Sequence, residues 1–121
     1  MSPFDEIDPN GKNPHESGAK LDFGKSPVYQ GLIDYFPRAC SAVANVSAAG
    51  AEKYAWKGWE DVPDGYNRYK NAQHRHALKR AIEGPYDSDF NKLGKHILHD
   101  AQEAWNALAA LELYLREQEQ E

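Results

Sequence analysis

Near the end of the chain, four ionisable residues share one helical spacing, with offsets of 0, 3, 4 and 7: His96, His99, Asp100 and Glu103. An upstream segment repeats these offsets: His76, Lys79, Arg80 and Glu83. At about 100° per residue, each set falls on one face of a helix. Acids and histidines on two such faces can hold a divalent cation or a polyphosphate between them. The spacing therefore indicates a metal-dependent enzyme, and the alternative is a solvated helix flank with ordinary charges.

Carboxylates are the expected ligands of the cation. Asp100 and Glu103 lie three residues apart and can reach one Mg²⁺ or Mn²⁺ from the same helix, because hard cations prefer oxygen ligands. Glu83 and Asp87 flank a Gly-Pro turn and can complete the cage across the helix pair. His99 is a further candidate ligand of the same cation.

Two other kinds of metal site remain open. Metal-dependent phosphohydrolases of the HD type use a His, then a His-Asp pair, then a final Asp, and His76 with His99-Asp100 match the first parts. No aspartate follows Asp100, so a glutamate would have to supply the last ligand. A site for iron or zinc with two histidines and one carboxylate is conceivable at His96, His99 and Glu103.

Four helical segments are predicted to position these residues, at about 27–33, 37–54, 66–83 and 91–117. Ser26-Pro27 reads as an N-cap followed by proline at the first helical position, and Gly84-Pro85 ends the third segment. The last segment carries a continuous apolar seam: Leu93, Ile97, Ala101, Ala104, Leu108, Leu111 and Leu115. No segment alternates with period two. We therefore expect an all-α antiparallel helical bundle, completed by a second copy in a homodimer or homotetramer.

The remaining composition bounds the organisation of the chain. Its 121 residues fit one domain, with a flexible arm over residues 1–18, a domain over 19–117 and a solvated tail over 118–121. The net charge of −5 argues against nucleic acid as a partner. Cys40 is the one cysteine and excludes an internal disulfide, which favours the cytoplasm. No apolar run is long enough for a membrane span, and the start does not resemble a secretory signal.

Several motifs resemble phage-type dATP/dGTP diphosphohydrolases, which belong with the MazG-like nucleotide pyrophosphohydrolases. The opening pattern G-x-K-x-D-x-G-K is matched by Gly18, Lys20, Asp22, Gly24 and Lys25. The next block is matched by Ala39, Val43, Ala44, Val46, Gly50, Ala51, Lys53, Tyr54 and Trp59. An Arg-His pair corresponds to Arg75-His76, and a His-x-x-His helix leading to an asparagine is echoed by His96, His99 and Asn106. The resemblance covers about residues 17–115.

This resemblance implies a MazG-like fold and hydrolysis of purine (deoxy)nucleoside triphosphates to monophosphate and pyrophosphate with Mg²⁺ or Mn²⁺. Such an enzyme would control a phage nucleotide pool in the host cytoplasm. The implied catalytic carboxylates are Glu83, Asp100 and Glu103. The implied phosphate-binding residues are Lys20, Lys25, Lys53, Arg75 and His76, since lysine and arginine suit phosphate oxygens. Tyr54, Trp56 and Trp59 are the expected base-stacking residues, with anchoring of its loop as the alternative for Trp59.

A helical oligomer that binds partners without catalysis is the competing function. Many relatives carry a glutamate where this chain has Ala42, and the last motif is about three residues longer than theirs. Both departures favour a protein that has kept the fold and not the reaction.

Overall fold

The computed structural model describes residues 6–119, and its contacts divide the chain into two compact units, Met1–Pro37 and Arg38–Glu121. The predicted arm and tail extend outside the described residues, at 1–5 and 120–121. The predicted boundary at residue 18 stays a prediction.

Turns and irregular backbone make up most of the described part of the first unit. Asp8 is buried, and its carboxylate accepts hydrogen bonds from the backbone N–H groups of Lys12 at 2.8 Å and Lys20 at 3.3 Å. These two hydrogen bonds hold the loop over residues 8–20 closed. A short π-helix, η1 (Tyr29–Ile33), follows. The predicted short helix is therefore present, but no side chain caps it and the predicted cap at Ser26 is wrong.

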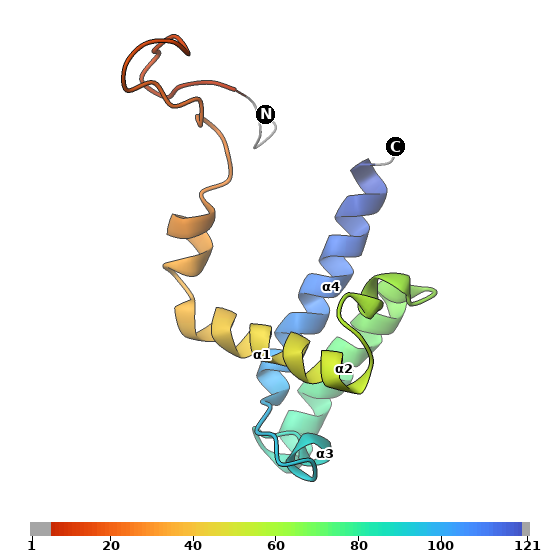
Figure 1. Ribbon diagram of the computed structural model, residues 1–121. Helices are drawn as coiled ribbons and strands as arrows, with labels where there is room; N and C mark the ends of the chain where they lie inside the picture. Colours follow the sequence, from red (N-terminus) through yellow and green to blue (C-terminus); the bar gives the residue numbers. More distant parts are fainter. Residues whose placement is uncertain (1–5, 120–121) are drawn as a thin grey trace. The chain divides into compact units, whose positions relative to one another are not determined.

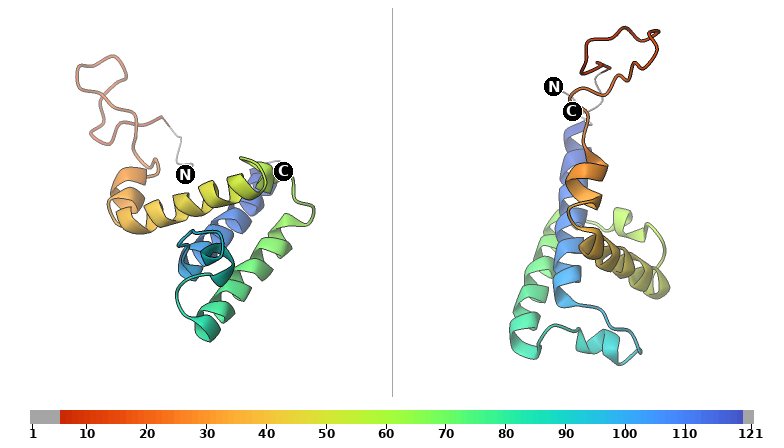
Figure 2. Two further views of the ribbon diagram at one scale, coloured as in Figure 1. Left: turned by 60° about the horizontal axis from the view of Figure 1, so that its bottom comes forward. Right: turned by 90° about the vertical axis from the view of Figure 1, so that its left-hand side faces the viewer.

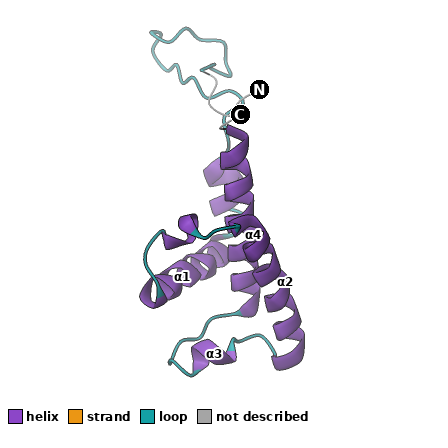
Figure 3. Cartoon of the chain, turned by 90° about the vertical axis from the view of Figure 1, so that its right-hand side faces the viewer, coloured by secondary structure: helices purple, strands orange, loops and turns teal. Residues whose placement is uncertain are grey.

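Helices make up the second unit (Figure 1): α1 (Pro37–Lys53), the 3₁₀-helix η2 (Gly58–Asp61), α2 (Gly65–Glu83), α3 (Ser88–Asn91) and α4 (His99–Glu119). α2 and α4 run antiparallel, side by side, and make the most extensive contact between elements, while α1 lies across α4 (Figure 2). Residues 6–119 contain no strand, only an isolated bridge between Tyr86 and Leu98 (Figure 3). The predicted all-α class is confirmed.

Small residues allow the helices of the second unit to approach closely. Val46 and Ala49 of α1 pack against Ile97 and Ala101 to form a small apolar core. A Cβ on Gly65 would lie 2.8 Å from a methyl carbon of Leu113, so only glycine allows the first turn of α2 to lie this close to α4.

None of the helices in the described range has the length and apolar content that a membrane span requires.

The predicted helix over 91–117 is wrong at its start. α3 ends at Asn91, Gly94 has a φ of +74°, and α4 does not begin until His99. The intervening residues return as an extended segment, where the N–H of Asp87 donates to the carbonyl of Ile97 at 2.9 Å. The apolar seam continues through this break, which is why periodicity alone reads one helix. As a result, His96 lies outside the helix that carries His99.

Candidate functional site

The C-terminal half of α2 and the start of α4 bring four ionisable side chains together: His76, Glu83, Asp87 and His99. We call this group the histidine–carboxylate cluster. His76 and Glu83 lie on α2, seven residues and about two turns apart. Asp87 caps α3, and His99 is the first residue of α4. The antiparallel packing of α2 on α4 therefore places both helix ends, and the turn that joins them, at one point.

His99 is the centre of the cluster and is fully buried, with 0% of its surface exposed. Its Nε2 lies 2.6 Å from Glu83 Oε1, and its Nδ1 lies 3.0 Å from Nδ1 of His76. A carboxylate only accepts hydrogen bonds, so the ring proton of neutral His99 sits on Nε2 and is donated to Glu83. The Nδ1 lone pair of His99 then faces His76.

Asp87 is a carboxylate held in place on both oxygens. It is 4% exposed. Its Oδ1 accepts from the N–H of Asp89 at 2.9 Å, which caps α3, and its Oδ2 accepts from Nε2 of Gln102 at 2.8 Å. Burial by itself raises the pKa of Asp87, but these two hydrogen bonds and the nearby histidines outweigh it, so the pKa of Asp87 is lowered. The group is ionised at neutral pH.

The other members of the cluster also have shifted pKa values. Hydrogen bonds from Ser88 and His99 lower the pKa of Glu83 to about 2. Burial lowers the pKa of His76, and the neighbouring His99 lowers it further. At neutral pH the cluster therefore holds two carboxylates and a neutral His76, a protonation state in which nitrogen and oxygen lone pairs are free for a cation.

A buried polar stripe on α4 supports the cluster, and its middle residue, Gln102, was missed in the sequence. It consists of His99, Gln102 and Asn106, at offsets of 3 and 7. Gln102 holds Asp87, and Nδ2 of Asn106 donates to the carbonyl of Gln102 at 2.8 Å. The signal in the sequence was the spacing of His99, Gln102 and Asn106, which places these polar residues on one helical face next to the apolar residue Ala101.

Of the predicted metal ligands, the structure brings together Glu83, Asp87 and His99 but not the other two. The Asp100 side chain is 64% exposed and pairs with Arg80 at 3.2 Å. Neither Asp100 nor Glu103 belongs to the group in which the ligand atoms of His76, Asp87 and His99 lie within 4.8 Å of one another. The helical register explains this, because His99 and Gln102 are buried on α4, whereas Asp100 is exposed and Glu103 is only partly buried.

The predicted phosphate-binding residues are divided between the two units. Lys20 and Lys25 belong to the first unit, where Lys25 pairs with Glu6 at 2.9 Å. In the second unit, Nζ of Lys53 lies over the ring of Tyr54, 5.3 Å from its centroid. Arg75 is exposed on α2, next to the half-buried His76. His76 is the one member of the predicted set that joins the cluster.

The predicted base-stacking residues have two different surroundings. Tyr54 and Trp56 are 76% and 70% exposed. Trp59 packs edge-on against Tyr69 and Trp105, and its carbonyl accepts a hydrogen bond from the Tyr69 hydroxyl at 2.6 Å. The structure therefore places Trp59 as the anchor of its loop.

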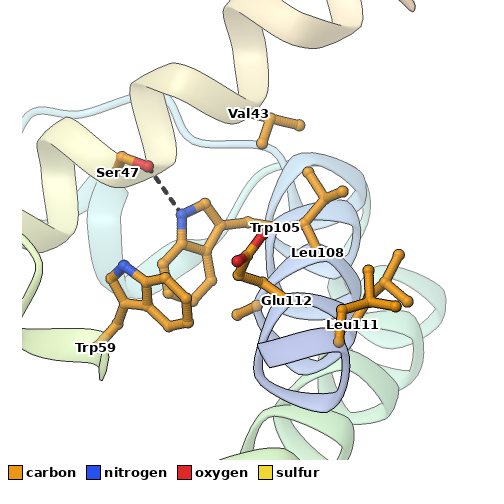
Figure 4. Close-up of a pocket in the computed structure, with 9 residues that line it drawn as sticks. Val43, Ser47, Trp59, Trp105, Leu108, Leu111 and Glu112 are labelled. Carbon is orange, nitrogen blue, oxygen red and sulfur yellow. Dashed lines mark hydrogen bonds between the residues drawn. The ribbon is translucent and has the colours of Figure 1, made fainter. Parts of the chain in front are cut away.

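An apolar groove is lined by residues of α1, η2 and α4 and has a volume of about 370 Å³ (Figure 4). Its lining includes Val43, Trp59, Trp105, Leu108 and Leu111. At its edge the indole N–H of Trp105 donates to Ser47 Oγ at 2.9 Å, which ties α4 to α1. Apart from Glu112 at its rim the groove has no charged lining residue, so it does not supply the chemistry of the cluster.

Over residues 15–121 the chain matches the family described as dATP/dGTP diphosphohydrolase, N-terminal. No curated protein and no solved structure matches the chain. The matched range takes in all four residues of the histidine–carboxylate cluster as well as the Gly-Lys-Asp motif of the first unit. The chain belongs to the family of dATP/dGTP diphosphohydrolase N-terminal domains.

Proposed function

We propose that this chain hydrolyses purine (deoxy)nucleoside triphosphates to the monophosphate and pyrophosphate, with Mg²⁺ or Mn²⁺ as cofactor. The observation that supports this is the partly buried histidine–carboxylate cluster, in a chain whose family is described as dATP/dGTP diphosphohydrolase, N-terminal. A role in phage nucleotide metabolism within the host cytoplasm is part of the same proposal.

The donor atoms of the cluster fit a divalent cation. Two imidazole nitrogens and one carboxylate oxygen converge from His76, His99 and Asp87, and all are buried or half-buried. Such a cation, when bound, would neutralise triphosphate oxygens and make a bound water more acidic. The convergence of three ligands, two imidazoles and a carboxylate, that bind metals best when deprotonated supports the cofactor.

Glu83 orients His99 in this proposal and does not act as the general base. A general base works best with a pKa near the operating pH, whereas the pKa of Glu83 is about 2. Its hydrogen bond to Nε2 of His99 fixes the tautomer of that ring instead. The side chain of Glu83 is 26% exposed, so it also forms part of the rim through which a substrate would reach His76.

Basic residues on α2 can bind the triphosphate beside the cluster. Arg75 and Lys79 are close enough to lower the pKa of His76 by their charge, and both are exposed. Arg80 is one residue further along and pairs with Asp100 across the gap to α4. Their exposed charges are free to turn toward a polyanion, since surface ion pairs of this kind are weak.

A second candidate function is a phosphohydrolase of the HD type, which would release triphosphate. The contact between His76 and His99, with Nδ1 atoms 3.0 Å apart, favours it. The position of Asp100 does not, because its carboxylate lies on Arg80 and Asp87 takes its place beside the histidines.

We also propose that the chain assembles with copies of itself, as the sequence suggested. Large apolar side chains are exposed along α4: Leu108, Leu111, Tyr114 and Leu115. Contiguous exposed apolar surface of this kind marks interaction sites. Light scattering after size-exclusion chromatography would give the mass in solution, and a monomer at micromolar concentration would contradict this part of the proposal.

The reaction is tested with a panel of the eight common (d)NTPs in Mg²⁺ or Mn²⁺, with products separated by chromatography. We expect dATP and dGTP to give monophosphate and pyrophosphate. His76→Ala should abolish turnover, and His74→Ala, which changes an exposed histidine on the same helix, should not. Release of triphosphate would favour HD-type chemistry, and no turnover of any nucleotide would favour a non-catalytic interaction protein.

A further inference from the structure

The two histidines of the cluster face each other through the same type of ring nitrogen. Nδ1 of His76 and Nδ1 of His99 are 3.0 Å apart. Because Glu83 holds the proton of His99 on Nε2, the Nδ1 of His99 carries a lone pair. Two arrangements account for this contact: His76 donates a proton from Nδ1 to Nδ1 of His99, or both nitrogens bind one cation.

The spacing of the two nitrogens suits a cation. Imidazole nitrogens bind metals at about 2.1 Å, so two of them at a right angle lie about 3.0 Å apart and at a tetrahedral angle about 3.4 Å apart. The observed 3.0 Å matches neighbouring positions of an octahedron. An octahedron with three protein ligands keeps three positions for water or substrate oxygens.

Asp87 supplies the charge that such a cation would balance. It is 4% exposed, and within residues 6–119 it forms no ion pair with a lysine or arginine. A buried carboxylate without a counter-charge is costly. Each oxygen of Asp87 accepts one hydrogen bond and retains a second lone pair.

Each of these ligands is oriented by a partner of its own. Glu83 holds His99, and Gln102 holds Asp87. Carboxylates that accept the distal N–H of a ligating histidine, and groups that fix a ligating carboxylate, are the usual outer surroundings of protein metal sites. Residues that merely fill space would need neither.

We propose that His76 Nδ1, His99 Nδ1 and Asp87 form a two-histidine, one-carboxylate site that selects a first-row transition-metal ion over Mg²⁺. Mg²⁺ prefers oxygen ligands and keeps several waters, whereas imidazole suits the ions from Mn²⁺ to Zn²⁺. The inference deepens the proposed function, since it concerns the same cluster, and of the two ions named there it favours Mn²⁺. Glu83 and Gln102 are positioning residues of this site.

The first test measures binding of the metal alone to the full chain by calorimetry, without nucleotide. We expect Co²⁺ and Mn²⁺ to bind at one site per chain, at least tenfold more tightly than Mg²⁺. His76→Ala and Asp87→Asn should each weaken Co²⁺ binding at least tenfold. His74→Ala and Asp89→Asn are matched controls on α2 and α3, with exposed side chains, and should leave it unchanged.

Glu83→Gln tests the positioning role separately. Loss of such an outer partner weakens metal affinity about 10- to 100-fold while the ligands remain. The visible absorption of bound Co²⁺ should therefore keep its nitrogen-ligand character at saturating metal. A purely structural role of Glu83 would lower thermal stability and leave the Co²⁺ affinity as it was.

A second test needs no variant and holds even if a substituted chain fails to fold. Zn²⁺ added to the wild-type protein should shift the ¹⁵N resonances of Nδ1 in two of the five histidine rings, His76 and His99. Unchanged rings, or Mg²⁺ affinity equal to that of Co²⁺, would overturn the inference. If the metals bind as expected but no nucleotide is hydrolysed, the proposed function is wrong and the metal site stands. If the His76→Ala variant still hydrolyses nucleotide with Mg²⁺, the metal site is wrong and the proposed function stands.

Discussion

Gln102→Met isolates the hydrogen bond that holds the buried carboxylate of Asp87. Methionine has nearly the volume of glutamine and keeps the packing of α4, but it cannot donate. In the native protein, Nε2 of Gln102 lies 2.8 Å from Asp87 Oδ2, and the two residues are 6% and 4% exposed. Water therefore cannot replace the lost donor without opening the contact between α4 and the turn that follows α2.

The expected cost follows from the charge of the acceptor. A hydrogen bond to a charged group contributes about 1.5–3 kcal/mol to the stability of the folded protein, and this contribution is lost when the buried acceptor has no donor. For a unit of this size, each kcal/mol shifts the melting temperature by about 4–8 °C. Gln102→Met should therefore lower the free energy of unfolding by about 1.5–3 kcal/mol at pH 7, and the melting temperature by roughly 6 to 24 °C.

The pH dependence distinguishes this bond from packing. The pKa of Asp87 is lowered in the folded protein, partly by Gln102, so the contribution of Asp87 to stability is present above its ordinary pKa and is lost as pH falls through the folded value. The difference between wild type and Gln102→Met should accordingly shrink in acid.

Urea denaturation followed by circular dichroism at pH 7 and in acid measures both effects. Gln118→Met, an exposed glutamine on the same helix, is the matched control and should change stability by less than about 0.5 kcal/mol. A Gln102→Met variant as stable as wild type at pH 7, or one equally destabilised at both pH values, would refute the reasoning.

Three further predictions concern the surroundings of the site. The pKa of Glu83 is about 2 in the folded protein, so its stabilising contribution is complete above its ordinary pKa near 4.5 and is lost as pH falls toward 2. Glu83→Gln should therefore make the melting temperature depend less steeply on pH between about 4.5 and 2, and an unchanged slope would contradict this. Ser47→Ala removes the acceptor of the Trp105 indole N–H and should cost about 0.5–1.5 kcal/mol in urea titrations, a cost that disappears in a Trp105→Phe background. Asp100→Asn removes an exposed pair with Arg80 and should cost under about 0.5 kcal/mol by thermal denaturation, with a larger loss showing that Asp100 is more than a surface group.

The helices that punctuation residues delimit could be predicted from the sequence. Pro37 begins α1, and Gly84 with a φ of +97° ends α2, and both helices lie where proline and glycine placed them. The start of α4 could not be found this way. Gly94 lies inside a seam that keeps its apolar steps on both sides of the break, and only the pairing of Pro85 and Asp87 with the extended segment before His99 reveals the interruption.

The cluster was partly predictable for a related reason. The prediction of Glu83 and Asp87 as neighbours of His99 agrees with the structure, because Glu83 ends α2, Asp87 lies in the turn that follows, and α4 begins at His99. Spacing does not say which face of a helix turns inward. The predicted apolar seam correctly included Ala101, but it continued through Ala104, which is exposed, whereas the buried face continues through Gln102 and Ala109. That rotation moves Asp100 to the surface and turns Gln102 inward.

Both apolar and polar contacts stabilise the second unit. The buried apolar residues in the described range are mostly alanines, so the area that each removes from water is small. Where α2 meets the start of α4, the contact consists of the Glu83–His99–His76 chain and the Asp87–Gln102 bond instead. A buried polar network favours folding only when every member is satisfied, and its geometry is then strict. The hydrogen bonds that join the two helices are therefore the same ones that hold ligand atoms of His76, Asp87 and His99 within 4.8 Å of one another, so loss of either bond would disturb both the packing of the helices and the geometry of the cluster.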